Sequence, residues 1–338
     1  MRIALDAMGG DRGPEMAIQG ALAAVRERSD LHVILVGPRP LLEKQVADLS
    51  SSWNEARERI AVYHAPEVIT MDDSPVEAVR RKKEATVMVG FDLVKNGEAD
   101  ALVSAGNSGA TMAAAIRKLG RLPGISRPGI ASFFPTVKKP VMLMDIGANV
   151  DCRPQHLYEF AVMASSCSRL LLHYDHHPRI GLLSIGAETG KGNALVKGTY
   201  GLLKQSPLFH FIGNVEGRDV YKGDVDVIVC DGFVGNVSLK ISEGLAEAAM
   251  QMLKQEIMKT WRAKIGYLLL REAFAGVKKQ VDYAEYGGAP LLGIDGTGII
   301  CHGASNAIAI RNAIYVAASM VRNRINEAIV QTLGEHAA

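Results

Sequence analysis

Lys191 has the surroundings that phosphate binding requires. It stands in Gly190-Lys191-Gly192-Asn193, shortly after an apolar run that ends at Ser184. A lysine ammonium group can reach a phosphate oxygen, and flanking glycines let backbone N–H groups approach the same anion. The spacing GxxxxGK[ST] of a nucleotide P-loop is absent, so we do not predict one. We predict that Lys191 binds phosphate together with the backbone of its three motif neighbours. A solvated loop lysine is the alternative.

His302 is a second candidate for chemistry. It lies in the motif CHGAS (301–305), just before the last long helix. An imidazole titrates near neutral pH and suits proton transfer. A structural or capping histidine is the alternative, although the Gly and Ser that follow favour a functional residue. His173, His176 and His177, in contrast, fall in a polar stretch that is typical of an exposed turn, and we predict no bound metal.

Two joints between a strand and a helix carry amides and carboxylates. Asn107 and Ser108 open a helix after a short strand, and Asp231 and Asn236 occupy a similar joint. Helix capping explains such residues, because Asn, Asp and Ser side chains accept hydrogen bonds from first-turn N–H groups. The functional alternative is that Asn107 polarises a carbonyl group, while the other three bind phosphate or substrate. Both interpretations remain open from the residues alone.

These residues belong to a larger pattern, in which seven apolar runs each end in a short loop of Gly, Asn, Ser and Asp. A strand that enters such a loop and then a helix directs free N–H donors at an anion. We predict that the backbone of Gly9 and Gly10, in the first loop, also binds substrate. Together the loops predict a large polar site for a phosphate-bearing substrate. They are DAMGGD (6–11), SAGNSGA (104–110), DIGANVD (145–151), SIGAETGKGN (184–193), IGNVEGRD (212–219), DGFVGNVSLK (231–240) and CHGASN (301–306).

The elements that must position these loops alternate between short apolar strands and helices. This order predicts an α/β fold with a mostly parallel, doubly wound sheet. Such a sheet binds its ligand beyond the carboxyl ends of its strands, so we expect all seven loops to gather there. The predicted strands are Arg2–Asp6, His32–Val36, Ile60–His64, Ala101–Ser104, Gly129–Phe134, Val141–Asp145, Ile180–Ser184, His210–Gly213 and Val225–Cys230.

Helix signals fill the intervals between the strands. A capping box at Ser74, with Pro75 and Glu77 behind it, predicts a helix that continues to Asn96. The other predicted helices lie near Pro14–Arg28, Ser108–Leu119, Pro154–Leu172, Ala194–Lys204 and Asn306–Leu333. No Gly/Ser-rich or Pro-rich linker divides the chain, so we predict a single domain over residues 1–338.

One segment, residues 245–280, differs from this alternation. Its pattern is helical, it is rich in lysine and arginine, and its apolar residues recur at spacings of three and four. A basic amphipathic helix pair can lie on an anionic membrane surface. A helical hairpin packed in a dimer interface is the alternative, and both can hold in one dimer.

Composition excludes several other classes of protein. The net charge of +2 gives no general attraction to nucleic acid, and the four cysteines lack the spacing of a zinc site. Reduced thiols in a cytoplasmic protein are the simplest interpretation. We find neither a signal peptide nor an apolar run of the roughly 20 residues that a membrane-spanning helix needs. The chain is expected to be soluble or bound to a membrane surface.

Taken in order, the loops resemble those of the PlsX family of bacterial phosphate acyltransferases, the acyl-ACP:phosphate transacylases of phospholipid synthesis. The resemblance spans essentially the whole chain, and the ordered set of motifs is specific although each motif alone is weak. Residues 245–279 carry little of it. The motifs are DAMGGD, SAGNSGA, DIGANVDCRP, FIGNVEGRD, CDGFVGNVSLKISEG, YGGAPLLG and CHGASNAIAIRNAI.

The resemblance implies a reaction in which a fatty acyl group passes from acyl carrier protein to inorganic phosphate, without a cofactor. The acyl phosphate product would serve a membrane glycerol-3-phosphate acyltransferase. The resemblance also implies a homodimer, loosely attached to the membrane. The implied fold is a Rossmann-like α/β/α sandwich related to isocitrate and isopropylmalate dehydrogenases and to phosphotransacetylases, with residues 245–280 as a helical hairpin insertion that contacts the membrane.

For this reaction we assign roles to the candidate residues. Phosphate is itself a nucleophile, so the site must mainly hold anions and stabilise a tetrahedral oxyanion. We place phosphate on Lys191, helped by Asn236, and the oxyanion or thioester carbonyl on Asn107. His302 would orient phosphate or protonate the departing thiolate.

Two other functions remain alternatives. An NAD-dependent decarboxylating dehydrogenase of the related fold would also use Gly-rich loops, but the first strand is not followed by GxGxxG. A non-catalytic scaffold that binds acyl carrier protein is the other alternative.

Overall fold

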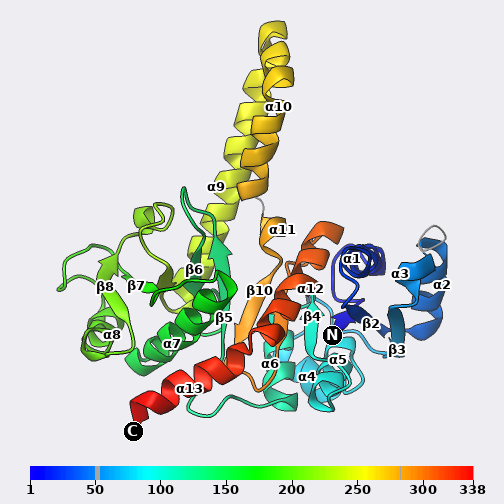
Figure 1. The fold of residues 1–338 in the computed structure, drawn as a ribbon, viewed down its shortest axis with the longest axis horizontal. Coiled ribbons are helices and arrows are strands. Elements are labelled where there is room, and N and C mark those ends of the chain that lie inside the picture. Colours follow the sequence, from blue (N-terminus) through cyan, green and yellow to red (C-terminus); the bar gives the residue numbers. More distant parts are fainter. Residues whose placement is uncertain (50–53, 282, 338) are drawn as a thin grey trace.

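A single mixed sheet forms the centre of the molecule (Figure 1). The computed structural model describes residues 1–49, 54–281 and 283–337. Eleven strands pair in the order β3-β2-β1-β4-β11-β10-β5-β6-β9-β7-β8, and helices cover both faces of the sheet. The predicted α/β/α architecture with a mostly parallel sheet is therefore confirmed. The strands are β1 (Arg2–Asp6), β2 (His32–Gly37), β3 (Ile60–His64), β4 (Ala101–Ser104), β5 (Gly129–Phe134), β6 (Val141–Met144), β7 (Arg179–Leu183), β8 (His210–Val215), β9 (Val227–Val229), β10 (Ala289–Leu292) and β11 (Gly298–Ile300).

The sheet consists of two parallel halves that run in opposite directions. Strands β3, β2, β1, β4 and β11 are parallel to one another, as are β6, β9, β7 and β8. Between the halves, β10 pairs antiparallel with β11 and with β5, and β5 pairs antiparallel with β6. Three reversals separate β11 from β6, so the carboxyl ends of the two halves lie at opposite edges of the sheet.

This topology corrects the expectation that all seven loops gather at one edge. The loops that begin at residues 6, 104 and 301 follow β1, β4 and β11. The loops that begin at residues 145, 184, 212 and 231 belong to the second half. We call the end of the sheet that carries the first group of loops the first-half edge, and the opposite end, which carries the second group, the second-half edge.

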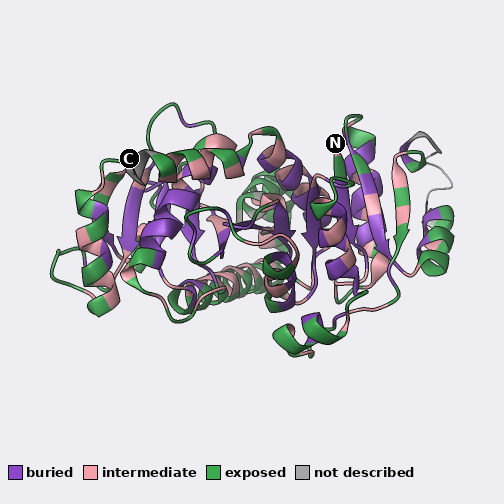
Figure 2. Cartoon of the chain, turned by 90° about the horizontal axis from the view of Figure 1, so that it is seen from below, coloured by how far each residue is buried: buried purple, intermediate pink, exposed green. Residues whose placement is uncertain are grey.

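Two apolar cores lie on the two faces of the sheet. The larger contains the inner sides of α1, α7 and α12, and the smaller contains those of α4, α5 and α6. Figure 2 shows buried residues concentrated in the strands and on the helix faces turned toward them. The helices outside the hairpin are α1 (Pro14–Glu27), α2 (Arg39–Leu49), α3 (Asn54–Arg57), α4 (Pro75–Arg81), α5 (Thr86–Lys95), α6 (Ser108–Lys118), α7 (Pro154–Leu171), α8 (Ala194–Gln205), α11 (Tyr283–Tyr286), α12 (Ala307–Arg322) and α13 (Ile325–Ala337).

Two predicted helices are each divided in the structure. The helix expected from Ser74 to Asn96 consists of α4 and α5, separated by a turn at residues 82–85. The helix expected from Asn306 to Leu333 ends at Arg322, and a new helix, α13, starts after Arg324, whose φ of 52° lies in the left-handed region. A left-handed residue cannot continue a right-handed helix, which explains the second break.

A long hairpin projects from the body of the protein (Figure 1). It consists of α9 (Gly232–Lys259) and α10 (Trp261–Val281), so its first helix starts 13 residues before the segment 245–280 selected from the sequence. The same helix therefore begins in one of the seven loops and reaches the tip of the hairpin. Among the described residues, no helix combines the length and hydrophobicity needed to cross a lipid bilayer.

Candidate active site

At the second-half edge, Asp145 organises the loop that follows β6. It is fully buried, and its two oxygens accept hydrogen bonds from the backbone N–H groups of Ile130, Gly147, Ala148 and Asn149, and from the Asn149 amide. Burial raises the pKa of Asp145, while these hydrogen bonds oppose the shift. Five donors on one carboxyl group fix the loop backbone in a single conformation.

The first turn of α9 packs directly on this loop. The N–H of Gly232 donates to the carbonyl oxygen of Asn149 at 2.7 Å, and a Cβ built on Gly235 would lie 1.9 Å from the carbonyl oxygen of Asp145. Only glycine fits at such an approach. Asp231 caps the helix by accepting from the N–H of Val234 at 2.9 Å, and Asn236 lies against Gly147. The predicted residues Asp231 and Asn236 are thereby placed at one joint.

Lys191 lies in the loop after β7, the strand next to β9. The Lys191 side chain is exposed, and its backbone N–H donates to the carbonyl oxygen of Glu188 at 3.0 Å. Gly192 has a φ of +96°, which a residue with a side chain rarely adopts. Asn193 caps α8, because its side-chain oxygen accepts from the N–H of Val196 at 2.9 Å.

Three helices follow three neighbouring strands at this edge. α7, α9 and α8 follow β6, β9 and β7, which are neighbours in the sheet and therefore about 4.8 Å apart from strand to strand. Each helix start offers N–H donors and the positive end of a helix dipole. Gly190, Lys191, Gly192 and Asn193 lie in the loop after β7, and Asp231 and Asn236 lie at the joint after the neighbouring strand β9. Such an arrangement can bind an oxyanion and stabilise developing negative charge.

The first-half edge has a corresponding organising residue in Asp6. This carboxyl group is buried and accepts from the Ser104 hydroxyl at 2.8 Å and from the N–H of Met8 at 3.2 Å. Burial raises its pKa, and the hydrogen bonds oppose the shift. A Cβ on Gly9 would lie 2.7 Å from the nitrogen of Gly106, and Gly10 lies beside Gly303. Loops that follow β1, β4 and β11 are thus packed closely together.

Asn107 and Ser108 lie at this first-half edge, and the Asn107 side chain forms several hydrogen bonds that hold the local structure. Its oxygen accepts from the N–H of Ala110 at 3.1 Å as the cap of α6. Its amide nitrogen lies within hydrogen-bonding distance of the carbonyl oxygens of Thr70, Met71 and Asp73. These contacts are those of a residue that holds a cap and a neighbouring loop.

His302 also lies at the first-half edge. Its Nδ1 accepts from the N–H of Ala304 at 3.1 Å, and the residue is exposed. The chain therefore places Asn107, Ser108, His302, Gly9 and Gly10 at one edge and the Lys191 group at the other.

None of the cysteines is activated as a nucleophile. Burial, helped by the charges of Asp145 and Asp231, raises the pKa of Cys152 to about 11. Burial alone raises the pKa values of Cys167 and Cys301 to about 12. Burial, helped by the charges of Asp231 and Asp145, raises the pKa of Cys230 well above its usual value. The thiolate is the reactive form, so these thiols stay protonated at neutral pH. Among the described residues, no three His, Cys, Asp or Glu side chains group as metal ligands.

Two arginines that the sequence analysis did not select lie beside the second-half edge. Arg153 precedes α7, and Arg127 donates from Nη1 to the carbonyl oxygen of Asp151 at 2.9 Å. Arg153 is part of the motif DIGANVDCRP, so attention to the whole motif could have found it. Arg127 lies 18 residues before Asp145, and no spacing in the sequence connects it to the loop.

Comparison with known proteins identifies the family of the chain. A family model described as "Fatty acid synthesis protein" matches residues 1–328. A phosphate acyltransferase of Geotalea uraniireducens is 53% identical over 336 residues, covering 99% of this chain and 95% of that protein. A phosphate acyltransferase of Nitratidesulfovibrio vulgaris is 51% identical over 331 residues, covering 98% and 94%.

Among solved structures, the fold is similar to that of a phosphotransacetylase. The EutD phosphotransacetylase of Staphylococcus aureus superimposes with a TM-score of 0.62 at 19% identity, covering 95% of this chain and 94% of that one. This likeness confirms the predicted relation to phosphotransacetylase folds. The sequence matches span nearly the whole chain. The chain therefore belongs to the phosphate acyltransferase family of fatty acid synthesis proteins and is an enzyme that transfers an acyl group to phosphate.

Proposed function

We propose that the acyl donor is acyl carrier protein and that the reaction takes place at the second-half edge. An oxygen of inorganic phosphate attacks the thioester carbonyl carbon, and a tetrahedral oxyanion forms. The C–S bond then breaks, the phosphopantetheine thiolate leaves and takes up a proton, and acyl phosphate is released. Membership of the phosphate acyltransferase family implies that an acyl group is transferred to phosphate. The identity of the acyl donor as acyl carrier protein is our proposal.

The observation that supports this proposal is the exposed Lys191 in the loop between β7 and α8, within the half of the sheet whose neighbouring strands β6, β9 and β7 each lead into a helix. Lys191 and the backbone of residues 190–193 would hold the acceptor phosphate, with Asn236 on the neighbouring helix. A fixed arrangement of cation and N–H donors binds phosphate and stabilises the negative charge of the intermediate without rearranging. Asp231 would act by fixing the start of α9 through its cap.

Asn107, Ser108, His302, Gly9 and Gly10 keep a proposed role in substrate binding, but at the first-half edge. That edge lies opposite the proposed site of reaction, so the roles of Asn107 at the thioester carbonyl and of His302 at the thiolate or phosphate do not fit this placement. We propose instead that these residues bind a part of the carrier-borne donor away from its thioester.

We also propose that the enzyme works as a cytoplasmic homodimer attached to the inner face of the cell membrane. Support comes from the hairpin, whose apolar side chains are largely exposed: Ile241, Leu245, Met252, Met258, Trp261, Ile265, Leu268 and Leu269. Exposed apolar surface of this extent is typical of an interface with protein or lipid. The product would then be released close to a membrane glycerol-3-phosphate acyltransferase. The alternatives of a dehydrogenase or a non-catalytic scaffold do not fit an acyltransferase family.

Replacing Lys191 by alanine tests the phosphate assignment. We expect the KM for inorganic phosphate to rise about 10- to 100-fold, since a hydrogen bond to a charged group contributes about 1.5–3 kcal/mol. Lys197→Ala provides a matched control, because Lys197 is an exposed lysine in the first turns of the adjoining α8. Normal activity and a normal KM for phosphate in Lys191→Ala would refute the assignment.

A further inference from the structure

Arg127 and Arg153 converge on the start of α7. The guanidinium group of Arg127 donates to the carbonyl oxygen of Asp151, two residues before Arg153. Arg153 is the residue that caps α7, and its N–H donates to Nδ1 of His156 at 3.1 Å. Both arginine side chains are exposed. Among the described residues, neither guanidinium group forms an ion pair with a carboxylate.

The segment that carries Arg127 is attached firmly to the second-half edge. On one side of Arg127, the N–H and hydroxyl of Ser126 donate to the buried carboxylate of Glu159 in α7, at 2.7 and 2.8 Å. On the other side, the carbonyl oxygen of Pro128 accepts from the Asn149 amide at 2.8 Å. Arg127 is therefore presented from a fixed backbone, which lowers the entropic cost of binding.

The loop that holds the Arg127 segment also contacts the start of α9, where Asn236 is proposed to help bind phosphate. Asn149 accepts at its carbonyl oxygen from Gly232, in the first turn of α9. Gly147, in the same loop, lies against Asn236. The two arginines thus flank one side of a loop whose other side contacts the Asn236 joint.

The local charges favour an anion. Burial and the neighbouring Arg127 and Arg153 lower the pKa of His156, despite an opposing effect of Glu159, so the field at the start of α7 is positive. Among the nearby carboxylates, Asp145, Glu159 and Asp231 are directed at backbone N–H groups. Asp151 is the exposed acidic neighbour of the two guanidinium groups.

We infer that Arg127 and Arg153 form a second oxyanion-binding position for a phosphate group of the substrates. This inference rests on the proposed reaction at the second-half edge. Guanidinium groups bind phosphate through paired N–H donors and keep their charge at all physiological pH values. The phosphate group has two possible sources: the inorganic acceptor and the phosphodiester of the donor's phosphopantetheine arm.

Kinetics of the full-length enzyme distinguish the two sources. Arg127→Gln, Arg153→Gln and the double variant are compared with Arg121→Gln and Arg169→Gln as matched controls. Arg121 bonds to a backbone carbonyl in the same loop as Arg127, and Arg169 is exposed in the last turn of the helix that Arg153 caps. KM is measured for inorganic phosphate, for acyl carrier protein carrying an acyl group, and for an acyl-pantetheine thioester that lacks the phosphate.

We expect one KM to rise about 10- to 100-fold in the double variant. A rise for inorganic phosphate assigns the position to the acceptor. A rise for the carrier-borne donor, but not for the phosphate-free thioester, assigns it to the phosphodiester. Arg127→Lys should give an intermediate KM, because it keeps the charge but loses the fork of donors.

Three outcomes would overturn the inference: KM values within twofold of the wild type, an equal rise for both donors with no change for phosphate, or a loss confined to kcat. The melting temperature of each variant shows that the fold is retained. Failure of the Lys191 assignment is a separate result, because Lys191→Ala can leave phosphate dependence normal while the arginine variants still change a KM.

Discussion

At the scale of single residues, Asp6 and Asp145 have the same structural role in the two halves of the sheet, which is to hold the loop that follows their strand. Each stands at the carboxyl end of a strand, is buried, and accepts hydrogen bonds from N–H groups of the loop that follows, while Asp6 also accepts from the Ser104 hydroxyl on β4. Because both carboxyl groups are engaged in these bonds, acidic residues are compatible with the proposed phosphate-binding loops. Their types were visible in the motifs DAMGGD and DIGANVD, whereas their burial depends on the assembled sheet.

The structural role of Asn107 could not be predicted from its residue type and position alone. Its type and its position after a short strand fit both a helix cap and a carbonyl-binding amide. The structure shows the cap, and also contacts with residues 70–73, which lie more than 30 positions earlier in the chain. A contact of this kind has no local signal, so sequence reasoning could name the residue but could not choose its role.

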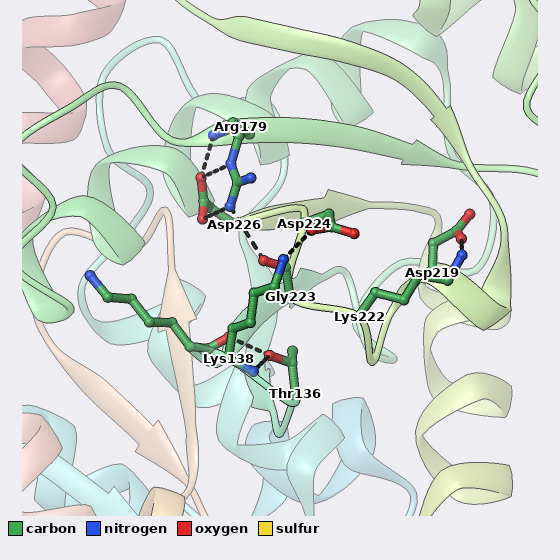
Figure 3. Close-up of polar contacts among 9 residues, drawn as sticks. Thr136, Lys138, Arg179, Asp219, Lys222, Gly223, Asp224 and Asp226 are labelled. Carbon is green, nitrogen blue, oxygen red and sulfur yellow. Dashed lines mark hydrogen bonds and ion pairs between the residues drawn. The ribbon is translucent and has the colours of Figure 1, made fainter.

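The ion pair between Arg179 and Asp226 leads to a stability prediction (Figure 3). Asp226 has a side chain only 5% exposed and accepts from the N–H, Nε and Nη2 of Arg179 at 2.8–3.0 Å. Burial would raise the pKa of Asp226, but these bonds hold it below 3.8. The stabilisation is therefore complete above pH 3.8 and is lost as pH falls through the folded-state pKa.

We expect Asp226→Asn to lower the free energy of unfolding at pH 7 by about 2 kcal/mol. This is less than for a fully buried pair, because water reaches Arg179. Urea titrations at pH 7 and pH 3 should show the difference from wild type shrinking at the lower pH. Asp224→Asn, which removes the exposed partner of Lys138 in the same cluster, should leave stability almost unchanged. A difference for Asp226→Asn that is independent of pH would contradict the account.

At the scale of elements, the start of α9 depends on Gly235. No room exists for a Cβ there, whereas a Cβ on Gly244, further along the same helix, meets no atom within 4 Å. We expect Gly235→Ala to destabilise the protein by about 1–3 kcal/mol and to reduce activity through the displaced loop. Gly244→Ala should stabilise it by up to about 1 kcal/mol. Thermal unfolding and turnover of both variants test this, and equal behaviour of the two would contradict it.

The hairpin tip gives a prediction about membrane contact. Met258 and Trp261 flank the turn between α9 and α10, and both are more than half exposed. Replacing both by serine should weaken binding to vesicles with anionic lipids at least about tenfold, since apolar side chains supply the insertion energy. Turnover of soluble substrates should stay normal. Val137→Ser, at another highly exposed apolar residue, serves as the control, and unchanged co-sedimentation of the tip variant would exclude this contact.

Most elements could be predicted because their local signals are strong. The nine predicted strands are present, with ends that shift by one or two residues. β10 and β11 were not predicted as strands, since they are four and three residues long and β10 contains Pro290. They form because β5 and β4 offer free edges, which is information from the tertiary structure. The turn at residues 82–85 likewise depends on tertiary contacts, because the N–H groups of Glu84 and Thr86 donate to Glu67.

At the scale of the whole molecule, strand direction separates the seven loops into two groups. Hydrophobic patterning identifies strands but does not show their direction, and two of the three antiparallel pairings at the centre involve β10, which sequence reasoning missed. The expectation of one common edge was therefore wrong. The ordered motifs nevertheless identified the family, because their order along the chain does not depend on how the strands pair.

The homodimer prediction also belongs to this scale. Ile241 and Leu245 lie on the part of α9 nearest the body and are about two-thirds exposed. Replacing both by aspartate should shift the enzyme toward monomers, because association at an apolar interface is opposed by buried charge. Sedimentation equilibrium measures the change, with the tip variant of Met258 and Trp261 as the control. A dimer of unchanged affinity, or a wild-type monomer, would contradict this placement of the interface.

The most direct measurement is the transfer of acyl groups to radiolabelled inorganic phosphate from acyl carrier protein. The wild-type enzyme should form labelled acyl phosphate, release one carrier thiol for each molecule formed, and leave the thioester intact when phosphate is omitted. Lys191→Ala should form the same product only at about 10- to 100-fold higher phosphate concentrations. Thiol release without phosphate, or labelled product that forms equally well in Lys191→Ala, would contradict the account.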